Sequence, residues 1–182
     1  MNLYLMRHAS AGQRRSNPVL DLKRPLDKAG KRDCLLLGNT LSGMNVSFDL
    51  IVSSPLKRSL QTAALVGTET GYEQKIVLSD AVAPTATYAQ FEKLLVESSG
   101  VESLLVVGHS PNLVEFLGLL LQPSHHMHPN QPPASVRLRK GAIARLNLER
   151  GAAILQWMLD PRIVRSLYAS STTRSRRKIS LK

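Results

Sequence analysis

An Arg-His pair at positions 7 and 8 directly follows the short apolar run Leu3–Met6. An apolar run of this length is typical of a buried strand, and the small residues Ala9 and Ser10 indicate a turn out of the sheet. In open α/β sheets, ligands bind beyond the carboxyl ends of the strands. The pair therefore predicts an imidazole on a rigid base beside a fixed cation, a combination that can hold a phosphate and attack it.

Two further segments place chemically capable residues just after a predicted strand. Residues 53–58 read Ser-Ser-Pro-Leu-Lys-Arg, where Pro55 is suited to open a helix with Arg58 in its first turn, and residues 108–112 read Gly-His-Ser-Pro-Asn. Taken singly, Arg58 could be a surface cation and His109 a hydrogen-bonded turn histidine. Their shared position beyond strand ends favours one common site with Arg7 and His8.

These four residues suit phosphoryl transfer. Arg7 and Arg58 carry planar, permanently charged groups that bind phosphate oxygens in pairs, and helix N-termini after residues 55 and 110 add N–H donors. A neutral His8 can attack phosphorus and form a phosphohistidine intermediate, while a protonated His109 stabilises the charge on the phosphoryl oxygens. The cations are built in, so we predict neither a metal nor another cofactor.

The elements that must position these residues alternate along the chain. Strands are expected at 2–7, 49–53, 76–78, 103–108, 142–148 and 153–159, and helices at about 27–43, 56–69, 87–98 and 110–121. Strand–helix alternation favours a mostly parallel sheet covered on both faces, whereas the last two strands are close enough to form a hairpin. We expect a three-layer α/β/α sandwich that ends in an antiparallel hairpin.

Three ordered motifs resemble the histidine phosphatase (phosphoglycerate mutase-like) superfamily. They are Leu-Met-Arg-His-Ala at 5–9, Ser-Ser-Pro-Leu-Lys-Arg-Ser-Leu-Gln-Thr-Ala at 53–63 and Val-Gly-His-Ser-Pro at 107–111. Within that superfamily the chain is similar to the small phosphohistidine phosphatases of SixA type, with further likeness at 21–30, 141–144 and 159–162. The likeness covers roughly residues 1–165.

The resemblance implies that His8 is the phosphorylated nucleophile and that Arg7, Arg58 and His109 complete the phosphate pocket. The superfamily usually has Gly where this chain has Ala9. Larger members place a proton-donating Glu after the third strand, where this chain has Asp80; Asp21 lies in another segment that can border the pocket. The proton donor is therefore Asp80, Asp21 or neither, and each Asp is equally consistent with a surface carboxylate.

The substrate remains open among several classes. Only 51 positions separate Arg58 from His109, which leaves no room for the large lid expected of a sugar-phosphate mutase. We therefore expect a phosphatase that acts on a phosphorylated protein, foremost on phosphohistidine, or on a small phosphate ester. A phosphoglycerate mutase-like enzyme remains an alternative, and a non-catalytic phosphate-binding module is an alternative of another class.

Charge is concentrated at the C-terminus. The net charge is +11, and residues 161–182 hold seven basic residues and no acidic one, which leaves +4 for the rest. We expect a phosphatase domain over 1–165 and a basic, disordered tail over 166–182. Such a tail could contact nucleic acid, but without interleaved aromatic residues the pattern disfavours that partner. The sequence predicts no oligomeric state.

The remaining features predict an ordinary cytoplasmic protein. No signal peptide precedes Arg7 and no apolar run is long enough to cross a membrane, so we expect no membrane partner. The single cysteine, Cys34, lies in an apolar stretch and is expected to be a buried, inert thiol. His125, His126 and His128 lie in a proline-rich loop without carboxylates, which disfavours a metal site there.

Overall fold

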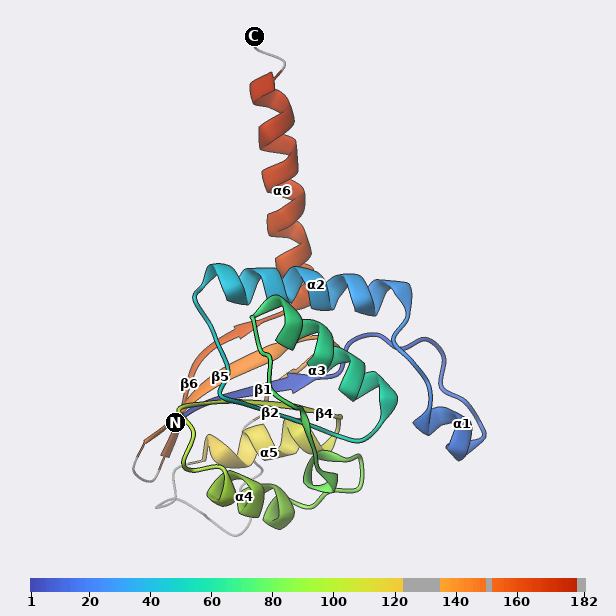
Figure 1. The fold of residues 1–182 in the computed structure, drawn as a ribbon, viewed down its shortest axis with the longest axis vertical. Coiled ribbons are helices and arrows are strands. Elements are labelled where there is room, and N and C mark those ends of the chain that lie inside the picture. The colour runs from blue at the N-terminus through green and yellow to red at the C-terminus, as the bar shows by residue number, and fades with distance from the viewer. Residues whose placement is uncertain (123–134, 150–151, 180–182) are drawn as a thin grey trace.

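The computed structural model describes residues 1–122, 135–149 and 152–179 and contains one six-stranded sheet (Figure 1). The strand order is β3-β2-β4-β1-β5-β6. The strands are β1 (Asn2–Arg7), β2 (Leu50–Ser53), β3 (Val77–Leu78), β4 (Ser103–Gly108), β5 (Ile143–Glu149) and β6 (Ala152–Leu159). The first four run parallel, while β5 pairs antiparallel with both β1 and β6. The predicted mostly parallel sheet with a C-terminal hairpin is confirmed.

Helices cover both faces of this sheet (Figure 1). They are α1 (Pro18–Leu22), α2 (Lys28–Gly43), α3 (Lys57–Glu69), α4 (Tyr88–Glu97), α5 (Asn112–Leu120), α6 (Pro161–Ile179) and the 3₁₀ turn η1 (Asp80–Val82). On one face, α2, α3 and the start of α6 pack through Leu37, Val66 and Val164. On the other face, α4 and α5 pack through Phe91 and Phe116, whose rings stack 4.9 Å apart. The α/β/α sandwich is thus confirmed.

Short polar residues set where two of the predicted helices begin. Asp27 caps α2 by accepting a hydrogen bond from the Gly30 amide at 2.7 Å. Thr87 and Gln90 form a reciprocal capping box at the start of α4, which satisfies two amides that have no partner within the helix. The start of α3 differs slightly from the prediction, because Pro55 lies outside the helix and Leu56 is the residue before its first turn.

Three elements depart from the sequence prediction. The short helix α1 and the turn η1 were not expected, since neither is long enough to show a hydrophobic period. Helix α6 starts at Pro161 and crosses the predicted boundary at 165, and its backbone is helical to Ile179. The structure therefore differs from the irregular tail expected from residue 166; Arg and Lys favour the helix intrinsically, even without an apolar period. No helix among the described residues is long and apolar enough to span a membrane.

The sheet register brings three strand ends together. Arg7 at the end of β1 lies opposite Gly108 at the end of β4, and Ser53 at the end of β2 lies opposite Val107. Because these neighbouring strands are parallel, the residues that follow them emerge at one edge of the sheet. The 50 residues between Arg58 and His109 hold the rest of α3, then β3, η1, α4 and β4.

Candidate active site

His8 follows β1 and is held by the backbone on both sides. Its amide donates to the carbonyl of Gly108 at 3.0 Å, and its own carbonyl accepts from the Gly141 amide at 3.1 Å. The ring nitrogen Nδ1 lies 2.8 Å from the carbonyl oxygen of Ala9. A carbonyl oxygen only accepts, so a neutral His8 carries its proton on Nδ1 and its lone pair on Nε2. This is the protonation state that a nitrogen nucleophile needs.

Burial keeps the imidazole of His8 neutral. The residue is only 6 % exposed. Burial lowers the pKa of His8 from 6.5 to about 4, and the positive charges of Arg58 and Arg7 lower it further. The hydrogen bond with the Ala9 carbonyl raises this pKa but does not offset the burial. At neutral pH the ring therefore has a free lone pair.

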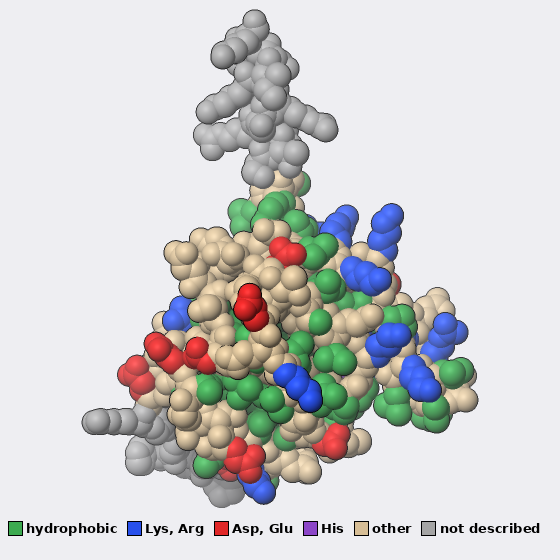
Figure 2. Space-filling view, viewed as in Figure 1, with side chains coloured by type: hydrophobic (Ala, Val, Ile, Leu, Met, Phe, Trp, Pro, Cys, Tyr) green, Lys and Arg blue, Asp and Glu red, His purple; other side chains and the backbone are tan. Residues whose placement is uncertain are grey.

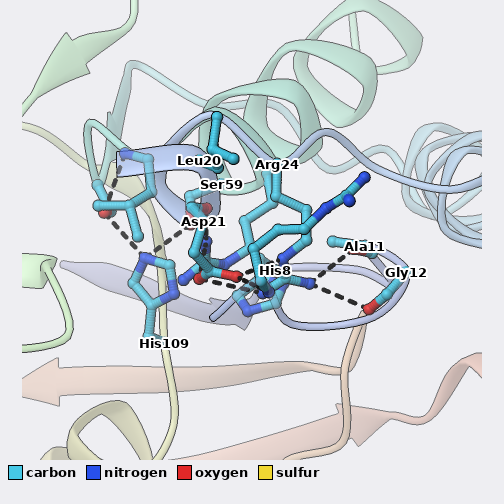
Figure 3. A network of polar contacts seen from close by, with 12 residues as sticks. His8, Ala11, Gly12, Leu20, Asp21, Arg24, Ser59 and His109 are labelled. Carbon is cyan, nitrogen blue, oxygen red and sulfur yellow. Dashed lines mark hydrogen bonds and ion pairs between the residues drawn. The ribbon is translucent and has the colours of Figure 1, made fainter. Parts of the chain in front are cut away.

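His109 follows β4 and lies beside His8, with the two ring centroids 5.0 Å apart. Its Nε2 is 2.9 Å from the hydroxyl of Ser54 and 3.1 Å from that of Ser59, so two buried serines orient the ring (Figure 3). Burial and then the nearby His8 and Arg58 lower the pKa of His109 to about 3. His109 is therefore neutral in the free protein, and the protonated form that the sequence analysis expects requires the negative charge of a bound phosphate.

The two arginines present unused donors. Arg7 donates from Nη1 to the carbonyl of Leu138 at 3.1 Å, and Arg58 donates from Nη1 to the carbonyl of Asp21 at 3.0 Å. Among the described residues, none accepts a hydrogen bond from the buried Nε of either side chain. Burial lowers the pKa of both guanidinium groups, which nevertheless stay charged at neutral pH. A dianionic phosphate would satisfy donors of this kind.

Asp21 and Asp80 differ in position and in chemistry. Asp21 accepts from Arg24 Nε at 2.8 Å and lies 3.5 Å from Arg58 Nη1 (Figure 3). The hydrogen bond from Arg24, followed by that from the Arg15 amide, lowers the pKa of Asp21 to about 2. Asp21 therefore borders the site as an anion and holds no proton to donate. Asp80 is exposed in η1 and forms no ion pair with another described residue.

Several residues that the sequence reasoning did not single out hold the site in place. The hydroxyl of Thr62 accepts from the Ala9 amide at 3.1 Å and donates to the Arg58 carbonyl at 2.7 Å, which ties the turn after His8 to α3. A β-carbon at Gly30 would overlap the carbonyl oxygen of Ser10, so glycine permits α2 to approach that turn. Thr62 and Gly30 both lie inside motifs quoted from the sequence, but their roles depend on contacts across the fold.

The other two predictions about site chemistry concern Cys34 and the histidine-rich loop. Cys34 is fully buried in α2, and burial raises the pKa of its thiol to about 12, so it is inert as predicted. His125, His126 and His128 lie outside the described residues. Within the described part of the chain, no group of three His, Cys, Asp or Glu side chains is placed to hold a metal ion.

The low pKa values predict a characteristic loss of stability in acid. The unfolded chain binds protons at these histidines with a pKa of 6.5, whereas folded His8 and His109 resist protonation until about pH 4 and 3. The contribution of these two histidines to the free energy of unfolding is fully present above pH 6.5 and decreases as the pH falls towards 4, because the unfolded chain then binds more protons than the folded one. The melting temperature, followed from pH 7 to 4.5, should fall less steeply for His109→Asn than for the unmodified protein. Equal slopes for the two proteins would contradict these pKa shifts.

Comparison with known proteins identifies the architecture. Residues 3–82 match the family model of the histidine phosphatase superfamily (branch 1). The structure of the protein histidine phosphatase SixA complexed with tungstate is 25 % identical in sequence to this chain. The two align over 90 % of this chain and 99 % of SixA, with a TM-score of 0.74. The chain belongs to the histidine phosphatase superfamily. This histidine phosphatase carries the Arg7-His8 pair, Arg58 and His109 together at the carboxyl edge of its sheet, as the motifs predict.

Two further relatives of this histidine phosphatase extend over most of its length. An uncharacterized protein of Picosynechococcus sp. is 30 % identical over 165 residues, which make up 88 % of this chain and 92 % of the relative. A structure from Agrobacterium tumefaciens described as a phosphohistidine phosphatase SixA shares 25 % identity, with 88 % of this chain and 97 % of its own covered, at a TM-score of 0.68. The similarity thus extends over the whole sandwich rather than one motif.

Proposed function

We propose that this histidine phosphatase hydrolyses phosphohistidine on proteins through a phosphorylated His8. The observation that carries the proposal is the state of His8, which is neutral, has its lone pair on Nε2 and lies beside two cations with unused donors. Similarity to the protein histidine phosphatase SixA supports the same substrate class.

In the first step, Nε2 of His8 attacks phosphorus while the bond from phosphorus to the substrate nitrogen breaks. The electron pair of that bond goes to the departing imidazole. Arg7, Arg58 and His109 bind the three non-bridging oxygens, whose charge redistributes during transfer. The product of this half-reaction is dephosphorylated substrate and phosphohistidine at position 8.

In the second step, water attacks the phosphorus bound to His8. The P–N bond breaks, its electron pair returns to Nε2, and inorganic phosphate leaves with the oxygen of that water. Neither step needs a metal in this proposal, because the guanidinium groups of Arg7 and Arg58 supply the positive charge.

The state of the two carboxylates favours a phosphoramidate over a phosphate ester. An alkoxide leaving group needs a proton in the transition state, and a positioned general acid contributes about 10²–10⁴-fold to such a step. Asp21 is ionised and holds no proton to donate, and Asp80 is exposed without an ion pair to another described residue that would position its carboxyl. A protonated imidazole leaves without such help, which makes phosphohistidine the better substrate.

The decisive substrate test compares matched peptides in the presence of EDTA. A phosphohistidine peptide should be hydrolysed with a kcat/KM about 10²-fold above that of the same peptide carrying phosphoserine, because only the ester needs a general acid. Phosphohistidine also hydrolyses spontaneously, so the rate with His8→Ala is subtracted. Preference for the ester would favour a small-molecule phosphatase, and binding without turnover of either peptide would favour a phosphate-binding module.

A further inference from the structure

A basic lobe, residues 11–27, extends from the sheet beside the site and contains α1 (Figure 1). It is attached directly to the phosphate-binding arginine, because Arg58 donates to the carbonyl of Asp21. Arg24 closes the lobe on itself by donating to the carbonyls of Ala11 and Gly12 at 2.6 and 3.1 Å. The lobe encloses an open pocket of about 530 Å³, lined by residues 11–16 and 24–27. A chain bound at the site can reach this surface, because Asp21 of the lobe lies 3.5 Å from Arg58.

Both carboxylates of the basic lobe are used within it. Asp21 accepts from Arg24 and from the amide of Arg15. Asp27 accepts from the hydroxyl of Ser10 at 2.6 Å and from the amides of Gly12 and Gly30. Their negative charge is therefore already paired within the lobe and with its neighbours Ser10, Gly30 and Arg58.

Three exposed basic side chains of the lobe form no ion pair with a described carboxylate. Arg14, Arg15 and Lys23 are exposed, and no described carboxylate forms an ion pair with any of them. Positive charge that no carboxylate of the lobe neutralises favours an anionic partner.

The lobe is also apolar where α1 faces solvent. Val19, Leu20 and Leu22 are 59, 55 and 51 % exposed, and no residue of α1 is buried. Figure 2 shows Lys and Arg side chains gathered with hydrophobic ones over this lobe, at the right of the view. A small sugar or nucleoside phosphate offers nothing to an exposed aliphatic patch, whereas a protein segment with apolar and acidic side chains matches both features.

We propose that the basic lobe binds an acidic segment of the substrate protein that flanks its phosphohistidine, an inference that rests on the proposed function. Arg14, Arg15 and Lys23 pair with the carboxylates of this segment, and Val19, Leu20 and Leu22 cover its apolar side chains. The phosphate pocket then selects the phosphoryl group, and the lobe selects the protein that carries it.

The test uses two phosphohistidine peptides, one with Asp and Glu around the histidine and one with Asn and Gln in their place, together with p-nitrophenyl phosphate. The unmodified protein should hydrolyse the acidic peptide with a kcat/KM about tenfold above that of the neutral peptide, because exposed ion pairs contribute about a few-fold each. The difference should lie in a lower KM for the acidic peptide. In Arg14→Gln/Arg15→Gln/Lys23→Gln this ratio should fall to about one. Hydrolysis of p-nitrophenyl phosphate should change by less than about twofold.

Matched controls replace similar side chains away from the lobe. Lys75 is exposed in the connection from α3 to β3, and Val96 is 69 % exposed near the end of α4. Lys75 lies just before the amino end of β3, and Val96 lies at the end of α4 that leads to the amino end of β4. Both amino ends are at the edge of the sheet opposite the site. Lys75→Gln should leave the peptide ratio unchanged, and Val96→Asn should leave the KM of both peptides unchanged, whereas Leu20→Asn should raise it.

The outcomes separate this inference from the proposed function. An unchanged peptide ratio in the triple variant, or an equal loss on both peptides and on p-nitrophenyl phosphate, would overturn docking on the lobe and leave the phosphohistidine activity standing. Hydrolysis of p-nitrophenyl phosphate without hydrolysis of either peptide would overturn the proposed substrate class, and docking with it.

Discussion

Replacing His8 with alanine is expected to reduce phosphate release by about 10⁴-fold or more. The substitution removes the imidazole whose Nε2 we assign as the nucleophile, and water alone must then attack the substrate. The remaining phosphate pocket still binds, so the loss should fall on kcat rather than on KM. The measurement is steady-state hydrolysis of a phosphohistidine peptide, corrected for the rate without enzyme.

A second variant separates chemistry from folding in this experiment. His8→Asn keeps a polar group of similar reach that can still contact the Ala9 carbonyl, and it should be as inactive as His8→Ala while unfolding near the melting temperature of the unmodified protein. Activity within tenfold of the unmodified protein in either variant would refute the assignment of His8 as nucleophile.

Arg58→Ala is expected to lower kcat/KM by about 10²–10³-fold, the effect typical of removing one strong donor from a developing anion. Arg58 is buried, and its Nε has no partner among the described residues, so the substitution removes a permanently charged donor that we assign to the phosphate. Arg58→Lys should restore only part of the loss, because an ammonium group cannot contact two phosphate oxygens in one plane.

The matched control for Arg58 is Arg165, whose guanidinium pairs with Asp33 at 2.7 Å between α6 and α2. Arg165→Ala should lower the melting temperature slightly and leave kcat/KM unchanged. A similar kcat/KM loss in both variants would mean that the loss in Arg58→Ala reflects general destabilisation rather than lost phosphate contacts.

The sequence predicted the fold well because each main element has its own local signal. Apolar runs predicted all six strands to within one residue, and the four predicted helices match α2, α3, α4 and α5 to within two residues. The misses are elements without such a signal. Helix α1 has five residues and buries none of them, and α6 extends from the body with a basic rather than an apolar sequence.

The four main residues of the site could also be predicted from the sequence, because each belongs to a local motif at the end of a predicted strand. Arg7 ends β1, and His8, Arg58 and His109 follow the ends of β1, β2 and β4. The parallel strands of one sheet therefore bring these residues together. The contacts around them do not follow from any local pattern. Ser59 lies 50 positions before His109, and Asp21 lies 37 before Arg58, so only the folded chain shows that they touch. The lowered pKa of Asp21 likewise comes from the hydrogen bonds with Arg24 and with the Arg15 amide, with a smaller contribution from the charge of Arg58.

The central claim is that His8 carries the phosphoryl group during turnover, and rapid quenching tests it most directly. The enzyme is mixed with a ³²P-labelled phosphohistidine peptide and quenched in alkali, which preserves phosphohistidine. Label should appear on the protein within one turnover, map by proteolysis and mass spectrometry to His8, and be absent from His8→Ala. Full turnover with no labelled protein at any time, or label at a residue other than His8, would contradict the account.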